Sequence, residues 1–212
     1  MKNISAGRIF AAITLAALLS GGCNPIASEP GDLLMPLKVG NMWIGVETTY
    51  APSGATTIDD TLEIIATKVI DGETWYVASN GRYLTNRSDG LYIRESSANA
   101  CGGCGCTSFK GKYPARAGDS IITSTATVLL PDSDEPVEMI TVDRVVTADT
   151  VVQTAAGSFN VHHYRTEVAY PANARFVTPE SRFFKPNVGP VRIERGGDSV
   201  VWRWDLVKAV LR

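Results

Sequence analysis

The chain has 212 residues, of which 44% are hydrophobic, and its formal net charge is −2. This length and composition predict one globular domain that buries a core of its own without help from metals or disulfides. The near-neutral charge argues against the basic surface of a nucleic-acid-binding protein.

Residues 1–22 have the layout of a secretory signal. Lys2 and Arg8 precede an apolar run from Ile9 to Leu19, and small residues follow that run. The run is too short to span a bilayer core of about 30 Å. Without this segment the chain keeps 18 basic and 22 acidic residues, a net charge of −4 that would not attract an anionic membrane surface.

The end of this segment, "LLSGGC", resembles the lipobox of bacterial lipoproteins, in which a cysteine is lipidated and becomes the mature N-terminus. The resemblance implies that Cys23 carries the lipid and that the protein meets the membrane through it. Asn24 follows instead of the aspartate of inner-membrane lipoproteins, which implies the outer membrane, facing the periplasm or the cell surface. Residues 23–35, rich in Pro, Gly and small polar side chains, then form a tether to a domain at 36–212.

The domain has β patterning almost throughout. Segments rich in β-branched and aromatic residues lie between Gly, Pro and Asp at a spacing of about 8–12 residues. Ten of them are predicted as strands: 42–50, 57–70, 73–79, 90–95, 119–130, 137–146, 150–154, 158–170, 189–195 and 199–207. The helical period occurs only in the signal segment. We therefore predict an all-β fold, either an antiparallel sandwich, a curved sheet or an open barrel.

Three pairs of segments repeat in the same order along the chain. "PLKVGN" at 36–41 is echoed by "PARAGD" at 114–119, and "RYLTNRSDGLYIRE" at 82–95 by "RFFKPNVGPVRIER" at 182–195. Between them, "IATKVIDGETWYV" at 65–77 has a looser counterpart at 141–161. The order predicts two similar β-meanders packed as one domain, although turn chemistry alone also places Pro, Gly and Asp in this way.

The segments "PLKVGNMW", "GSFNVHHYR" and "FFKPNVGPVRIERGG" are similar to a pattern in bacterial envelope lipoproteins of unknown function. The resemblance implies an exported all-β domain and supplies no catalytic residues. The hexamer "CGGCGC" is not part of that pattern. It is interpreted as an addition, within a Cys/Gly-rich loop at 99–107, in the connection between the two meanders.

The hexamer contains Cys101, Cys104 and Cys106, and its chemistry has three interpretations. In an oxidising compartment, Cys101 would pair with Cys104 or Cys106, which leaves one thiol over. Three thiolates could instead bind Cu(I) or Zn, helped by backbone N–H groups of the glycines. The Cys-x-x-Cys spacing also occurs in thiol-redox proteins, but the βαβ context of those proteins is missing. The structural disulfide is favoured.

Other candidates are weaker. Trp202 and Trp204 share one face of the last strand and could line a cleft for an apolar ligand, although such a stripe is usually core. Adjacent histidines, His162 and His163, point to opposite faces of a strand and cannot form one site. The acidic segment 131–138 has the composition of a solvated turn and lacks the EF-hand spacing of calcium ligands.

The motifs of α/β-hydrolases, zinc proteases, P-loop enzymes and dinucleotide-binding enzymes are missing from the sequence. We therefore expect a non-enzymatic envelope module without a cofactor, which binds a protein partner or an apolar ligand or has a structural role. The alternative is a metal-binding or thiol-redox protein that uses the "CGGCGC" loop.

Overall fold

The computed structural model describes residues 33–94, 107–129, 136–170, 175–197 and 199–212. These residues form twelve strands and no helix, and thus no helix that could cross a membrane. The strands are β1 (Met42–Ala51), β2 (Gly54–Ile70), β3 (Glu73–Ala78), β4 (Tyr83–Arg87), β5 (Gly90–Arg94), β6 (Thr107–Lys112), β7 (Ser120–Leu129), β8 (Pro136–Thr154), β9 (Gly157–Tyr170), β10 (Arg175–Lys185), β11 (Gly189–Gly196) and β12 (Val200–Val210).

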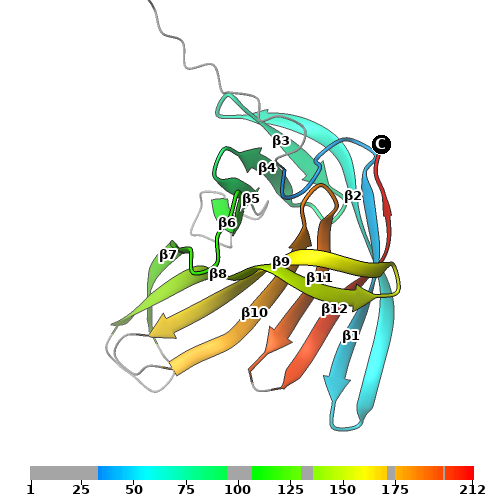
Figure 1. Cartoon of the computed structure of the whole chain (residues 1–212). Helices are drawn as coiled ribbons and strands as arrows, with labels where there is room; N and C mark the ends of the chain where they lie inside the picture. The colour runs from blue at the N-terminus through cyan, green and yellow to red at the C-terminus, as the bar shows by residue number, and fades with distance from the viewer. Residues whose placement is uncertain (1–32, 95–106, 130–135, 171–174, 198) are drawn as a thin grey trace, which may run out of the picture.

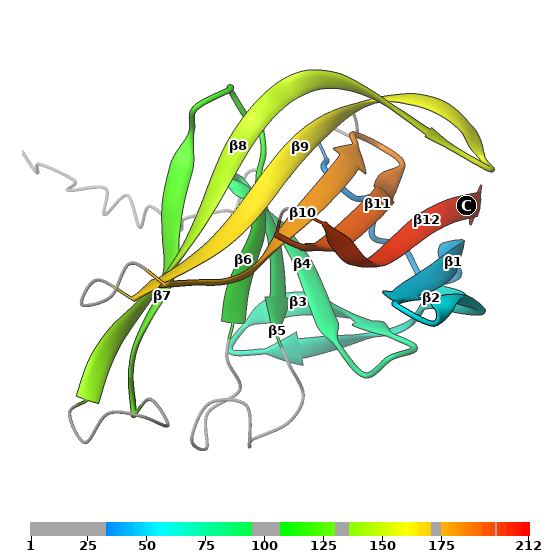
Figure 2. The same cartoon turned by 90° about the horizontal axis from the view of Figure 1, so that it is seen from below.

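All twelve strands belong to one antiparallel sheet in the order β6-β5-β4-β3-β2-β1-β12-β11-β10-β9-β8-β7. The sheet curls strongly, so that β3–β6 face β10–β12 across the inside of the curve (Figures 1 and 2). Its edge strands, β6 and β7, are neighbours in the chain but do not pair with each other. The prediction of an all-β fold is confirmed, and among its three alternatives the curved sheet is the one observed.

The strands differ from the prediction in two ways. β4, β6 and β10 were not among the ten predicted segments, and the segments at 137–146 and 150–154 form the single strand β8. β4 and β6 are only five and six residues long, which leaves little room for an alternating pattern. β10 contains Pro179, and its pairing with β9 is irregular between Val177 and Glu180, as expected where proline interrupts a ladder.

The sheet consists of two six-strand meanders, β1–β6 and β7–β12, that meet where β1 pairs with β12. The same turn precedes both. Gly40 and Gly118 have φ angles of 88° and 89°, in the left-handed region that favours glycine. The N–H of Gly40 donates to the Ile64 carbonyl at 2.8 Å, and that of Gly118 donates to the Val145 carbonyl at 2.9 Å. The two meanders predicted from the sequence repeats therefore begin with equivalent hydrogen bonds.

The core fills one end of the curve, which we call the closed end. Trp43, Ile64, Leu91, Val191 and Leu206 lie there, all almost fully buried. The segment before β1 crosses this end and adds three further buried side chains, those of Leu34, Met35 and Leu37.

Two sequence interpretations change here. Leu34 and Met35 were assigned to the tether, but they belong to the core, and the Met35 carbonyl accepts a 2.8 Å hydrogen bond from Asn86 Nδ2. The "CGGCGC" hexamer lies between β5 and β6, inside the first meander, whereas the two meanders are joined by residues 113–119. The sequence repeats had not revealed β6, so the loop before it was taken for the connection.

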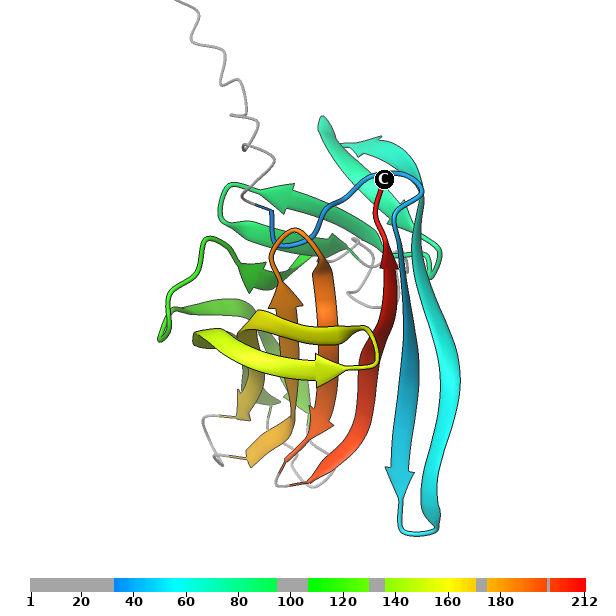
Figure 3. The same cartoon turned by 45° about the vertical axis from the view of Figure 1, so that its right-hand side comes forward.

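Two long hairpins extend from the sheet (Figure 3). The β1–β2 hairpin projects beyond the neighbouring strands, and much of β2 is exposed. The β8–β9 hairpin crosses β11 and β12 instead. Its tip is held there because the N–H of Ala156 donates to the Leu206 carbonyl at 3.3 Å and Arg192 Nη2 donates to the Gln153 carbonyl at 2.9 Å.

Candidate functional site

The inside of the curve holds a cavity of about 270 Å³ next to the core. Side chains from β1, β2, β5, β6 and β10–β12 line it, and so does the β3–β4 turn. Strands from both halves of the sheet therefore surround one space. Alternate residues of each strand face inward. For example, Val191 of β11 lies in the core, Ile193 lines the cavity, and Arg195 lies at its open end.

One wall of the cavity is apolar, and its main side chain is that of Trp204 on β12, which is only 5% exposed. Its indole ring lies over Gly45 of the neighbouring strand β1. A Cβ atom at Gly45 would overlap the indole atoms Cε2, Cζ2 and Nε1. The absence of a side chain at position 45 therefore makes room for this ring. Further apolar side chains in the lining are those of Leu62, Ile93, Phe184, Pro190, Ile193 and Trp202.

A charged cluster lies on β10, where Arg182 is only 2% exposed. Its Nη2 donates to the carboxylate of Asp143 on β8 and, at 2.6 Å, to the hydroxyl of Thr166 on β9. Thr166 in turn donates to the same Asp143 oxygen. A buried guanidinium is tolerated only where a carboxylate compensates it, and Asp143, itself buried, provides that charge.

The rest of this guanidinium group is less well satisfied. Arg182 Nη1 is buried and has no hydrogen-bond partner among the described residues. Nε is 3.6 Å from a Glu180 oxygen, which is beyond hydrogen-bonding distance. Burial raises the pKa of Glu180, but Arg182 and Arg195 outweigh that effect and hold this pKa below its ordinary value. Glu180 thus stays ionised and is bound at 2.8 Å by Arg195 Nε.

Lys110 of β6 adds a second cation to the cavity lining. Burial lowers the pKa of Lys110, and the nearby positive charge of Arg182 lowers it further. Glu180 and Asp143 act in the opposite direction, and Arg82 contributes a smaller lowering. Within the described parts of the chain, no carboxylate pairs with the Lys110 ammonium group. The lining therefore contains a half-buried cation that forms no ion pair with a described residue.

At the open end, which we call the mouth, the lining is polar. Asp60, Asn80 and Arg82 are exposed there, and Glu47 is half-buried. The Arg195 guanidinium lies 4.7 Å from the centre of the Trp202 ring. A polar rim around an apolar interior is the usual build of a small-molecule binding site.

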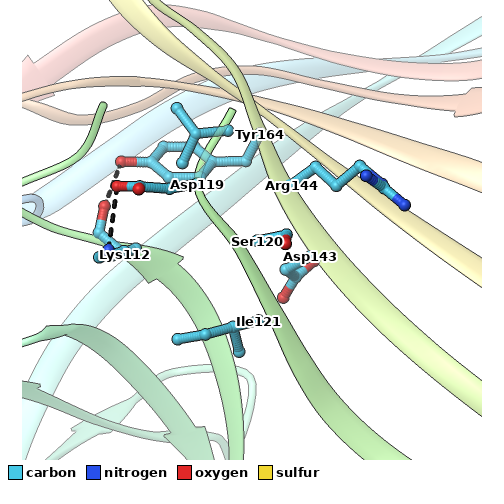
Figure 4. Close-up of a pocket in the computed structure, with 8 residues that line it drawn as sticks. Lys112, Asp119, Ser120, Ile121, Asp143, Arg144 and Tyr164 are labelled. Atoms are coloured by element: carbon cyan, nitrogen blue, oxygen red, sulfur yellow. Dashed lines mark hydrogen bonds and ion pairs between the residues drawn. The ribbon is translucent and has the colours of Figure 1, made fainter. Parts of the chain in front are cut away.

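A second, much smaller cavity lies where the two meanders are joined (Figure 4). Its volume of about 10 Å³ is at the lower limit for a single water molecule. Lys112 and Asp119 form a 3.0 Å ion pair beside it, and the Tyr164 hydroxyl donates to the Lys112 carbonyl at 2.7 Å. These contacts hold the end of β6 near the start of β7, so we interpret this place as a packing seam.

The structure brings two of the sequence-derived candidates into the large cavity, Trp202 and Trp204. Cys23, Cys101, Cys104 and Cys106 lie outside the described residues, as does most of the acidic segment at 131–138. His162 lies beside Tyr113 and Tyr164, whereas His163 stacks on Phe183 at 4.3 Å. In the part of the chain that the structure describes, no group of three His, Cys, Asp or Glu residues could hold a metal ion.

Arg182 and Lys110, which make the cavity unusual, were not predicted from the sequence. Both lie in strands that it did not predict, so no inward face could be assigned to either of them. One overlooked signal was Gly45. An isolated glycine in a strand indicates a bulge or a close approach by another group, and both occur here.

Comparison with known proteins identifies the class of fold. No protein-family model and no curated protein matches the chain. A solved structure from Bacteroides fragilis, a "putative exported protein with YmcC-like fold", aligns with a TM-score of 0.52 over 85% of this chain and 100% of its own, at 15% identity. The two proteins share a fold. A "putative lipoprotein" from Parabacteroides distasonis aligns with a TM-score of 0.48 over 84% and 99%, at 13% identity.

Proposed function

We propose that this chain is a lipid-anchored protein of the bacterial outer membrane that binds a small apolar ligand in the cavity of its curved sheet, without catalysis. The observation that carries the proposal is the cavity itself, which lies beside a filled core and has Trp202, Trp204 and Ile193 in its wall. A sheet with an entirely filled interior would instead favour a purely structural role or a protein partner.

The proposed anchor is the lipid on Cys23, which follows from the lipobox-like "LLSGGC". The absence of catalytic motifs from the sequence supports a binding role. A concave site with an apolar wall and a few polar groups is what a small, mainly apolar ligand requires.

The test uses N-phenyl-1-naphthylamine, a neutral apolar dye whose fluorescence increases in apolar surroundings. Residues 24–212, which include every described residue, should bind about one dye molecule per chain. Trp202→Ala should weaken binding several-fold, because it removes a large part of the apolar wall. Val207→Ala, an exposed change on the same strand, is the matched control. No saturable binding, or equal binding by Trp202→Ala and the unchanged chain, would overturn the proposal.

A further inference from the structure

The cavity combines its apolar wall with hydrogen-bond donors that are left unused. Arg182 Nη1 and Trp204 Nε1 are both buried, and both lack a hydrogen-bond partner among the described residues. Lys110 adds an ammonium group that forms no ion pair with any described residue. A buried donor that is left unsatisfied is destabilising, and more so when it is charged. Two such donors, together with the Lys110 ammonium group beside the same cavity, indicate a missing acceptor.

The charges inside the cavity show what kind of acceptor is missing. Away from the mouth, the lining contains the cations Lys110 and Arg182 and the carboxylate Glu180, and Asp143 lies behind Arg182. Asp143 is in an ion pair with Arg182 and Glu180 with Arg195, so among the described residues Lys110 is left without a carboxylate partner.

At the mouth the charges balance, because Glu47 and Asp60 are matched by Arg82 and Arg195. Asp60 and Arg82 are exposed there, and water and salt screen exposed charges far more effectively than buried ones. No described carboxylate at the mouth forms an ion pair with Lys110, and a ligand with one negative charge would supply that partner.

We propose, as a refinement of the function proposed above, that the ligand is an amphiphile with a single carboxylate, whose apolar body lies on Trp204 and whose carboxylate is bound by Arg182 and Lys110. The two ends of such a molecule match the two sides of the cavity. Leu62 of β2, Ile193 of β11 and Trp204 of β12 lie on the apolar side, whereas Lys110 of β6 and Arg182 of β10 lie on the other. Charge-assisted hydrogen bonds to a carboxylate are stronger than neutral ones and act best where water is excluded.

The experiment compares decanoate with decanol by isothermal titration of residues 24–212. The two probes share an alkyl chain and differ in the charge of the head group. We expect decanoate to bind about 10- to 100-fold more tightly, the usual range for hydrogen bonds to a charged group. Lys110→Met should remove most of this advantage and leave decanol affinity unchanged. Lys208→Met, which removes an exposed lysine on β12, should leave both affinities unchanged.

A second variant keeps the test independent of Lys110. In the pair Arg182→Met with Asp143→Leu, the free donor and its buried carboxylate are both replaced by apolar groups, so no unpaired charge is left behind. This variant should also lose the preference for decanoate. Equal binding of decanoate and decanol by the unchanged chain, or equal losses for both probes in the variants, would overturn the carboxylate inference alone. If no probe binds, N-phenyl-1-naphthylamine included, the proposed function itself fails.

Discussion

The indole ring of Trp204 on β12 fills the space that a side chain at Gly45 of β1 would need, so no side chain fits at position 45 while the ring keeps its position. The two residues are 159 positions apart in the sequence and lie on β1 and β12, the two strands through which the meanders pair. Their contact therefore links the pairing of β1 with β12 to the apolar wall of the cavity.

Gly45→Ala should lower the free energy of unfolding by about 1–3 kcal/mol, because the added methyl group overpacks the site and displaces the ring. Urea unfolding measures this loss, and a change in tryptophan fluorescence of the folded protein would report the displaced indole. Gly197→Ala is the matched control, since this exposed glycine has open space where the added methyl group would lie. Similar losses for both variants would contradict the fit described here.

Asp143→Ala should be far more destabilising than the loss of an exposed carboxylate. It leaves Arg182 buried without its counter-charge, which costs about 3–5 kcal/mol. Glu73→Ala removes a carboxylate from a partly exposed pair with Arg87 and should cost no more than about 1 kcal/mol. Replacing Asp143 by Leu and Arg182 by Met together should recover most of the loss in urea unfolding. A double variant as unstable as Asp143→Ala would show that the cluster is not acting as a compensated pair.

Glu180 should make stability depend on pH on the acid side. Its folded-state pKa lies below the ordinary value of 4.5, because Arg182 and Arg195 favour the carboxylate. Its contribution is thus fully present above that value and is lost as the pH falls through 4.5 towards the lower folded-state pKa. Urea unfolding from pH 7 to pH 3 should show a smaller acid loss for Glu180→Gln than for the unchanged chain. Parallel curves for the two proteins would contradict this assignment.

The tip of the β8–β9 hairpin offers a comparison between two neighbouring valines. Val152 is 6% exposed and belongs to the core, whereas Val151 is 68% exposed. Val152→Ala should cost about 2 kcal/mol through lost burial and a residual cavity. Val151→Ala should change the stability by less than about 0.5 kcal/mol. Thermal or urea unfolding of the two variants would show whether the hairpin tip is docked in solution, since an undocked tip would make them equal.

The three cysteines of the hexamer are tested by intact mass and thiol counting of the protein purified from the envelope. We expect a mass two hydrogens lower than that of the reduced chain, one free thiol among Cys101, Cys104 and Cys106, and no bound metal. One Cu or Zn per chain, lost in Cys104→Ser, would instead support the metal-binding alternative.

Period-two patterning was enough to predict the sheet and the shared inward face of Trp202 and Trp204, because alternation is a local property of a strand. The partners of Arg182 could not be found in this way. Asp143 and Thr166 reach it from β8 and β9, and their meeting depends on register across three strands. The chain around Arg182 contains a proline and several charges, which concealed a strand with a buried cation. The three cysteine interpretations remain predictions.

The segment that crosses the closed end has a further consequence for the lipid-anchored protein proposed here. The carbonyl of Leu33 accepts a hydrogen bond from the N–H of Asn187 at this end, and Cys23 lies ten positions earlier in the chain. Ten residues span at most about 35 Å when fully extended. A lipid on Cys23 would therefore make the closed end the part of the domain nearest to the anchor, within that distance of it. A ligand would then enter and leave the cavity at the end of the domain that lies farther from the anchor.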